Sequence, residues 1–183
     1  TKAGELLQGY LWQGRRELTL GTHEILGPAG GEGNIRTVTG TDPGSSGEEI
    51  AETVPADVVW KLLSFSAVLV TGSDAANRNP GLAIDDGTAT NRRWLTQTGS
   101  NHIANETRTH LWQRGPQAAG ASAEGDLGIG DTQTVNVKRV LPDDLILPEG
   151  YRIRTVTAAI DTTGPSFDNW SAPIFQVEEW LIV

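Results

Sequence analysis

The residues that could carry chemistry in this chain are its three histidines and several aspartates. The histidines are His23, His102 and His110. Imidazole nitrogens bind zinc and transfer protons near neutral pH. The sequence contains no HExxH motif and no cysteine, which excludes thiolate metal sites, disulfides and a cysteine nucleophile. His102 and His110 can share one face of a strand, but an isolated pair is more typical of a surface than of a metal site.

The aspartates lie at the ends of expected strands, as Asp85–Asp86, Asp143–Asp144 and Asp161. Calcium coordinates clustered carboxylate and carbonyl oxygens, but turn formation by aspartate explains the same positions. The serines lack a GxSxG context, and the glycine-rich stretch 27–33 lacks the Gly-Lys-Ser/Thr of a phosphate loop. The sequence therefore predicts a protein that is not an enzyme, with no catalytic residue, no metal and no cofactor.

Six tryptophans offer a different kind of site, because exposed indole rings on a β-sandwich can stack on sugars. Trp60 and Trp180 lie within apolar strands and are expected in the core or at a subunit interface. Three others lie near loops that carry arginine, asparagine and aspartate, and they would line a sugar site: Trp94, Trp112 and Trp170. A carbohydrate-binding module is thus the alternative function of another class.

The elements that would position these residues are mostly strands. The chain has 22 glycines and 9 prolines against 37% hydrophobic residues, which favours many turns and short strands. Residues 58–71 form its longest apolar, β-branched run, without glycine or proline, and predict a long central strand. Period-two alternation places one group on each face: Val59, Leu63, Phe65, Ala67 and Leu69 against Trp60, Leu62, Val68 and Val70 with Ser64 and Ser66. Both faces therefore look covered.

Other strands are expected at 82–87, 93–98, 103–112, 132–141, 151–160 and 174–183. The turn signals between 71 and 82 predict a hairpin of the central strand with residues 82–87. The closing strand has apolar side chains on both faces, together with Gln176, Glu178 and Glu179, which predicts burial between neighbouring strands or against another subunit. Around eight strands separated by turns indicate an all-β, antiparallel, jelly-roll-like β-sandwich.

The amino-terminal third differs in composition. Residues 1–53 read as an extended arm followed by a glycine-rich linker, and residues 54–183 as the sandwich domain. The apolar side chains of the arm are candidates for docking on a neighbouring subunit: Leu7, Tyr10, Leu11, Trp12 and Leu18. Alternatively, Trp12 and Leu18 cap the chain's own sandwich.

Charge and the length of the apolar runs exclude two classes of partner. The chain has 14 basic and 23 acidic residues, a formal net charge of −9, and its basic residues are not clustered. Nucleic acid is not expected, because neutralising phosphates needs clustered cations. No apolar run approaches the roughly 18–20 residues of a membrane span, so no membrane is expected as a partner.

Three segments of the chain form a pattern: Val54-Pro55 with Trp60 and the serines that follow, Ala76-Asn77-Arg78 with 82–87, and 147–154 with Asp168-Asn169-Trp170-Ser171. This pattern resembles small β-sandwich structural proteins of tailed-bacteriophage virions. The resemblance covers about residues 54–183 and leaves the arm outside. It implies a capsid decoration or cement protein, a head-fibre component or a neck or collar component. It also implies a trimer or higher homo-oligomer that contacts major capsid or other virion proteins, soluble before assembly and located on the particle surface.

Overall fold

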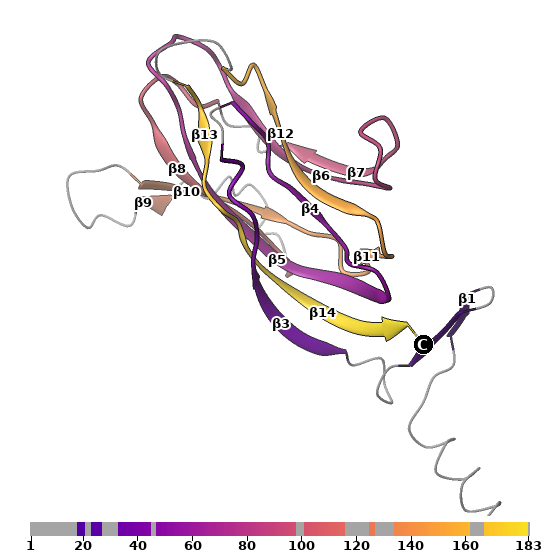
Figure 1. Ribbon diagram of the computed structural model, residues 1–183. Coiled ribbons are helices and arrows are strands. Elements are labelled where there is room, and N and C mark those ends of the chain that lie inside the picture. The colour runs from indigo at the N-terminus through magenta and orange to yellow at the C-terminus, as the bar shows by residue number, and fades with distance from the viewer. Residues whose placement is uncertain are drawn as a thin grey trace, which may run out of the picture.

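The computed structural model describes residues 18–20, 23–26, 33–44, 47–97, 101–115, 125–126, 134–161 and 167–182. Every regular element in these ranges is a β-strand, and the strands form two sheets that pack face to face (Figure 1). The predicted all-β sandwich is therefore confirmed. These ranges include no helix of the length and apolar character that a membrane span requires.

The large sheet has ten strands, in the order β1-β2-β14-β5-β8-β10-β9, with β3 paired to β14 and with β11 and β13 paired to β5. Its strands are β1 (Leu18–Leu20), β2 (His23–Leu26), β3 (Asn34–Thr39), β5 (Val58–Val70), β8 (Thr107–Gln113), β9 (Gly125–Asp126), β10 (Thr134–Val140), β11 (Ile146–Leu147), β13 (Asn169–Trp170) and β14 (Ile174–Ile182). The small sheet has the order β4 (Ala51–Thr53), β12 (Arg152–Ala158), β6 (Asn79–Asp85) and β7 (Arg92–Gln97).

The predicted central strand is present as β5, which is 13 residues long and lies in the middle of the large sheet. It pairs antiparallel with β14 on one side and β8 on the other. The closing strand β14 lies between β5 and β3, so its predicted burial between neighbouring strands is confirmed. One pair departs from the antiparallel pattern, because β10 runs parallel to β8.

The core lies between the two sheets and is aromatic at its centre. Phe65 of β5 stacks on Phe175 of β14 with ring centroids 5.9 Å apart, and it meets Trp112 of β8 edge-on, also at 5.9 Å. Leu82 and Ile84 of β6 cover them from the small sheet, and all five side chains are fully buried. Burying each such side chain contributes about 1.5–3 kcal/mol, so this cluster holds the two sheets together.

A β-bulge changes the predicted faces of the central strand. Gln176 of β14 lies opposite Ser64 but Val177 lies opposite Leu62, so Leu63 is an extra residue in β5. Beyond the bulge the alternation is inverted, and Trp60 and Leu62 point into the core with Phe65 rather than sharing the face of the serines. The expectation that both faces are covered fails at residues 64, 66, 68 and 70, which are at least partly exposed because the small sheet packs on the other face of β5.

The predicted hairpin between the central strand and residues 82–87 is wrong. β6 pairs with β12 and β7 in the small sheet, whereas β5 belongs to the large sheet. The connection between β5 and β6 therefore crosses from one sheet to the other. The turn residues in this connection are compatible with either path, and only the long-range pairing of β6 with β12 distinguishes them.

Four strands, β1 to β4, lie within the segment predicted as arm and linker. β3 pairs with β14 along six positions, and β4 pairs with β12. Leu7, Tyr10, Leu11 and Trp12 lie outside the described residues, and Leu18 is described only as the first residue of β1. The division at residue 53 and the docking role of the arm stay predictions.

Candidate interaction surface

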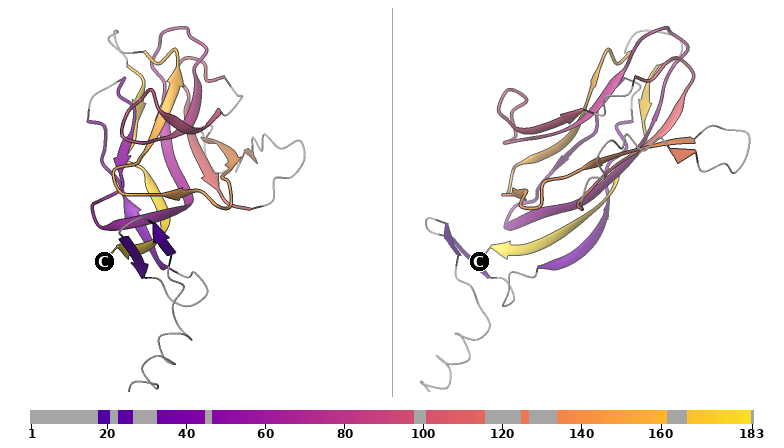
Figure 2. Two further views of the ribbon diagram at one scale, coloured as in Figure 1. Left: turned by 90° about the vertical axis from the view of Figure 1, so that its right-hand side faces the viewer. Right: turned by 180° about the vertical axis from the view of Figure 1, so that it is seen from behind.

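One face of the large sheet has no second layer of strands. The small sheet packs on one side of the large sheet only (Figure 2). The opposite side is formed by alternate residues of four neighbouring strands, β3, β14, β5 and β8, all at least partly exposed. We call this set the outer sheet face: Ile35, Thr37, Thr39, Ser64, Ser66, Val68, Val70, Thr107, Thr109, Leu111, Gln113, Ile174 and Gln176.

Strand register aligns these residues in rows across the sheet. One row runs Thr39, Ile174, Ser66, Leu111, and the next runs Thr37, Gln176, Ser64, Gln113. Two shorter rows pair Val68 with Thr109 and Val70 with Thr107. Each side chain lies about 5 Å from its neighbours in the row, so the rows make one continuous surface.

The relief of this surface follows from side-chain size. Ser64 and Ser66 of β5 form a low line at its centre. On either side stand the larger side chains of β14, with Ile174, and of β8, with Leu111. Further along β5 the order of size is reversed, because Val68 and Val70 lie beside Thr109 and Thr107 of β8.

The thirteen residues of the outer sheet face are uncharged, but charged residues lie in register with them. Glu178 pairs with Ile35 and with Lys61, to which it forms an ion pair at 3.8 Å, and Lys138 of β10 pairs with Leu111. Several apolar side chains of the face are open to solvent, with Ile35 67% exposed, Ile174 55% and Val70 44%. Exposed apolar residues gathered on one face are typical of a protein–protein interaction site.

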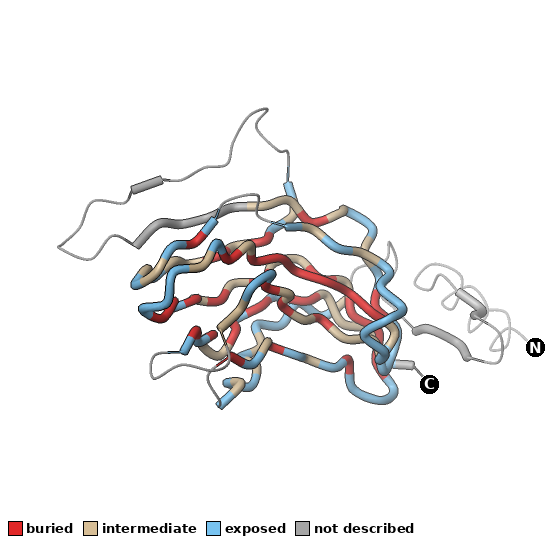
Figure 3. The backbone as a smooth tube through the Cα atoms, turned by 90° about the horizontal axis from the view of Figure 1, so that it is seen from above, coloured by how far each residue is buried: buried red, intermediate tan, exposed pale blue. Residues whose placement is uncertain are grey.

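The outer side of the small sheet is different, because it is charged. Arg152 and Arg154 of β12 donate hydrogen bonds to the carboxylate of Asp85, at 2.9 Å and 2.7 Å. Burial acts to raise the pKa of Asp85, but the hydrogen bonds from the two guanidinium groups outweigh it and lower the pKa. The two sides of the sandwich thus present opposite kinds of surface, and Figure 3 shows the buried residues between them.

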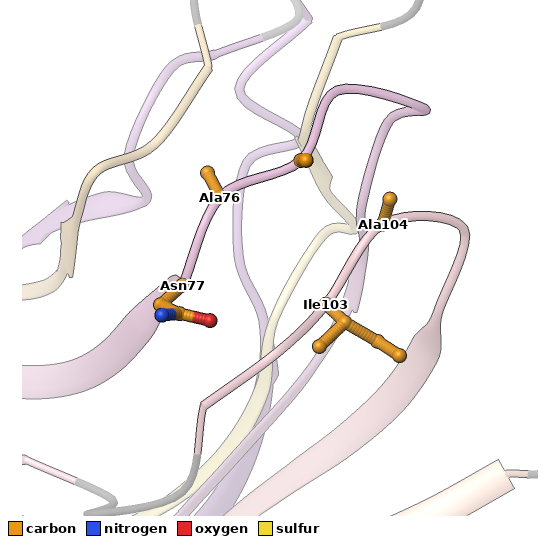
Figure 4. A pocket seen from close by; sticks show the side chains of 5 residues that line it. Ala76, Asn77, Ile103 and Ala104 are labelled. Atoms are coloured by element: carbon orange, nitrogen blue, oxygen red, sulfur yellow. The ribbon is translucent and has the colours of Figure 1, made fainter.

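A second feature lies at the end of the sandwich where β5 leads into β6. A hollow of about 360 Å³ opens between two loops and is lined by Ala75, Ala76, Asn77, Ile103 and Ala104 (Figure 4). Backbone hydrogen bonds connect the two loops, from Arg78 to His102 and back and from Asn105 to Gly72. The lining is mostly methyl groups, and Asn77 supplies its only polar side chain.

A buried ion pair holds these loops. Arg78 Nε donates to Asp168 Oδ2 at 2.8 Å, and both side chains are completely buried. Asp168 also accepts hydrogen bonds from the backbone N–H groups of Gly72, at 2.9 Å, and Asp161, at 2.7 Å. Arg78 Nη1 donates to the carbonyl of Asp74 at 2.8 Å. A carboxylate saturated in this way fixes loop geometry and is not free to act as a base.

His102 and His110 lie beside this pair and are not on the surface. Their rings stack with centroids 4.8 Å apart, and His110 also stacks on Trp112 at 5.5 Å. Both side chains are fully buried, and none of their ring nitrogens has a hydrogen-bond partner. In the described residues, no group of three or more histidine, cysteine, aspartate or glutamate side chains could hold a metal ion.

The buried histidines have strongly lowered pKa values. Burial lowers the pKa of His102 to about 3, with Arg108 and Arg78 acting in the same direction and Asp168 against them. Burial lowers the pKa of His110 to about 2, and the charges of His102, Arg108 and Arg139 add to this effect. Both imidazoles are therefore neutral at pH 7.

The structure does not bring the predicted sugar-stacking residues together on a surface. Trp112 and Trp170 are completely buried, so neither ring presents a face to a sugar. Trp94 of β7 is half-buried and packs against the core through its pairing with Ile84. These tryptophans were expected at the surface because arginines and loops lie near them in the sequence, but such neighbours do not determine the direction of an indole ring.

Comparison with known proteins adds little. The chain matches no protein-family model and no curated protein. Two solved structures show some similarity, and both come from infectious bursal disease virus. The first, of its T13 viral particle, is 9% identical with a TM-score of 0.31, covering 92% of this chain and 40% of that chain. The second, of the Gt strain, is 12% identical with a TM-score of 0.25, covering 93% and 43%. The chain thus spans less than half the length of both proteins.

Proposed function

We propose that this chain is a non-enzymatic structural protein of a virus particle, a capsid decoration or cement protein that self-associates and fastens to the capsid lattice. The outer sheet face is the observation that carries the proposal. It presents uncharged residues on four strands, with Ile35 and Ile174 more than half exposed and with the ion pair of Lys61 and Glu178 in the row of Ile35. A surface of this kind is suited to contact another protein chain, and the resemblance of residues 54–183 to virion sandwiches is the reason for proposing a virion as the setting.

The mechanism of such a protein is mechanical. Burying apolar surface stabilises an interface by roughly 25 cal/mol per Å², and part of this is offset by lost translational and rotational freedom. No cofactor or chemical step is required. The rigid sandwich, whose loops are fixed by the buried pair of Arg78 and Asp168, would hold the interacting surface in one shape before assembly.

Two other positions in a particle use the same surface. A neck or collar component and a head-fibre component would also contact copies of themselves and a ring or lattice of other chains. The carbohydrate-binding alternative receives no support from Trp112 and Trp170, because their rings are buried.

The proposal is tested on virus particles produced by a culture whose genome, viral or host, encodes this chain. Particles banded on a density gradient should contain the chain at a fixed ratio to their major shell protein, measured by quantitative mass spectrometry. A decoration protein should also dissociate from intact shells under mild denaturation before the shell opens. Absence of the chain from banded particles would overturn the proposal.

The arm gives a second prediction. Removing residues 1–26 deletes β1 and β2, and in the described part of the chain β2 pairs with β14 at two positions, Leu181 and Ile182. We expect the sandwich to stay folded, with a far-ultraviolet circular dichroism spectrum and a thermal unfolding midpoint close to those of the full chain. The native mass, measured by light scattering behind a sizing column, should fall to a smaller species. An unchanged oligomer would show that the arm does not hold the subunits together.

A further inference from the structure

We infer that the contact between two loops at one end of the sandwich opens in mild acid while the two sheets stay folded. The loops are residues 71–78, which connect β5 to β6, and residues 101–106, which lead into β8. We call their contact the loop junction. The inference goes beyond the virion role and does not depend on it, because every group involved belongs to this chain.

Backbone hydrogen bonds hold the loop junction together. Arg78 and His102 form an isolated β-bridge, in which their N–H groups donate to each other's carbonyls at 3.1 Å and 2.8 Å. Thr71 donates its N–H to the carbonyl of Glu106 at 2.8 Å, and its hydroxyl oxygen accepts the N–H of Glu106 at 2.9 Å. The bridge is not extended into a ladder, so few bonds must break for the loops to separate.

The outer side of the loop junction is loosely packed. The hollow of about 360 Å³ lies there, and its walls are Ala75, Ala76 and Asn77 on one loop and Ile103 and Ala104 on the other (Figure 4). Ile103 is the largest of these side chains and is 58% exposed. Local opening has the lowest free energy where few apolar contacts are lost. The loops can therefore separate at a smaller cost than the core strands.

The inner side of the loop junction encloses the imidazole of His102. This ring stacks on His110 with centroids 4.8 Å apart, and neither of its nitrogens has a hydrogen-bond partner. The positive charges of Arg108 and Arg78 oppose its protonation, and Asp168 acts against them with less effect. A proton on the enclosed ring would therefore lack both water and an acceptor. Opening of the junction supplies water, so protonation favours the open state.

Asp168 and Glu106 are already engaged in other bonds. Asp168 accepts hydrogen bonds from the guanidinium of Arg78 and from two backbone N–H groups. Glu106 pairs with Arg108 at 2.9 Å and also accepts a backbone N–H of its own loop. Neither carboxylate can bond to a protonated His102 without losing a bond that holds the loops.

His110 is held in the sheet rather than in a loop. It lies within β8, which pairs with β5 on one side and with β10 on the other. Its ring also packs against Trp112 and Trp170, with centroid distances of 5.5 Å and 5.4 Å, and the charges of Arg108 and Arg139 oppose its protonation. We expect this ring to stay buried when the loops separate. The open junction thus binds one extra proton, whereas the unfolded chain binds two.

The direction and size of the effect follow from linkage. The pKa of His102 is about 3 in the closed state, against about 6.5 for an exposed imidazole. Below pH 6.5 the open junction therefore binds more protons than the closed one, and opening becomes easier as the pH falls. From pH 7 to pH 5 the opening equilibrium should shift by about 25-fold for one ring, and by roughly 600-fold for the two rings that global unfolding exposes.

Hydrogen exchange at single backbone amides, followed by NMR at pH 7 and pH 5, tests the inference. Where the loops reclose faster than exchange occurs, the protection factor measures the opening equilibrium. After correction for the intrinsic exchange rate, protection of the Thr71, Arg78 and His102 amides should fall by about 25-fold. Amides of β5 that bond to β14 should be better protected at pH 7, and their protection should fall by roughly 600-fold. Unchanged protection at the junction, or the same fall there as in β5, would overturn the inference.

Two matched substitutions identify the ring that acts. His102→Phe keeps a flat ring against His110 but cannot bind a proton, so protection at the loop junction should be the same at pH 7 and pH 5. His110→Phe is the control and should retain the fall of about 25-fold at the junction. Acid-dependent opening of His102→Phe equal to that of the parent would contradict the inference. If either variant fails to fold, the comparison of junction and β5 amides in the parent decides.

Discussion

Replacing Asp168 by alanine should destabilise the sandwich by about 3–5 kcal/mol, because it leaves the buried guanidinium of Arg78 without its counter-charge. Both side chains are fully buried, so solvent does not screen their interaction. The substitution also removes the acceptor of the Gly72 and Asp161 backbone N–H groups. Measured against a typical stability of about 5–15 kcal/mol, this loss brings the protein close to unfolding at 37 °C.

A graded series keeps this prediction measurable. Arg78→Lys retains the charge but loses the planar fork that reaches Asp168 and the carbonyl of Asp74, so it should cost less than Asp168→Ala. In the double variant Arg78→Met with Asp168→Ala the unpaired charge is gone, and the loss should be smaller than the sum of the two single losses. Urea unfolding of the parent, Arg78→Met, Asp168→Ala and the double variant gives the coupling energy directly.

The exposed pair of Arg93 and Asp86 serves as the control. Its atoms lie 3.3 Å apart and the Arg93 side chain is more than half exposed, so solvent screens the interaction. Arg93→Met should leave the unfolding midpoint nearly unchanged. If Asp168→Ala were as mild as Arg93→Met, the Arg78–Asp168 pair would not be the element that fixes the loops.

The sequence predicts the strands of this fold well and their partners poorly. Residues 58–70 are identified as a strand because β-branched and apolar residues fill them without interruption. Nothing in that run marks Leu63 as the bulged residue, since a bulge depends on the register with β14. The assignment of β6 to the other sheet likewise follows from its pairing with β12, far along the chain.

The outer sheet face illustrates the same limit. Ser64 and Ser66 stand out in the sequence as small residues in an apolar strand, and that was the available signal. The rows that make them part of a surface join residues more than 100 positions apart, such as Ser66 and Ile174. Period two within one strand cannot supply that register.

The burial of the two histidines could not be predicted either. His110 lies on β8 between residues that alternate normally. His102 lies outside the named strands and is connected to Arg78 by an isolated β-bridge. Only the packing of the β7–β8 loop on the β5–β6 loop brings the imidazoles together. A polar residue in a loop is usually exposed, and here that expectation fails.

The stacked imidazoles should make the protein unstable in mild acid. The pKa of an imidazole in the unfolded chain is about 6.5, and burial lowers it to about 3 for His102 and about 2 for His110 in the folded state. Below pH 6.5 the unfolded state therefore binds two protons that the folded state does not. Stability must fall as the pH falls, starting near pH 6.5 and continuing to the folded pKa values.

The size of the effect follows from linkage. Each imidazole contributes a slope of up to about 1.4 kcal/mol per pH unit, so the pair should remove about 4 kcal/mol between pH 7 and pH 5. Asp85 and Glu179 have lowered pKa values, and the stability that they contribute is lost only below the unfolded values of 3.8 and 4.5. The window from pH 6.5 to pH 5 thus belongs mainly to the histidines.

The groups around the imidazoles oppose protonation. His102 is close to Arg78 and Arg108, whose charges outweigh that of Asp168, and His110 is close to Arg108 and Arg139. A proton on either ring would therefore add positive charge to a buried and already basic environment. The folded state has no way to accept it without local opening.

Substitution of one ring separates this effect from general acid sensitivity. His110→Phe keeps the flat ring stacked on Trp112, removes two nitrogens that have no hydrogen-bond partner and abolishes one titration. Urea unfolding at intervals from pH 5 to pH 7.5 should show about half the parent's slope in this variant, with stability at pH 7 preserved. An equal slope in parent and variant would mean that His110 does not titrate as a buried neutral group. A flat profile in both would contradict the buried stack itself, because two imidazoles with pKa values this far below 6.5 must make stability depend on pH.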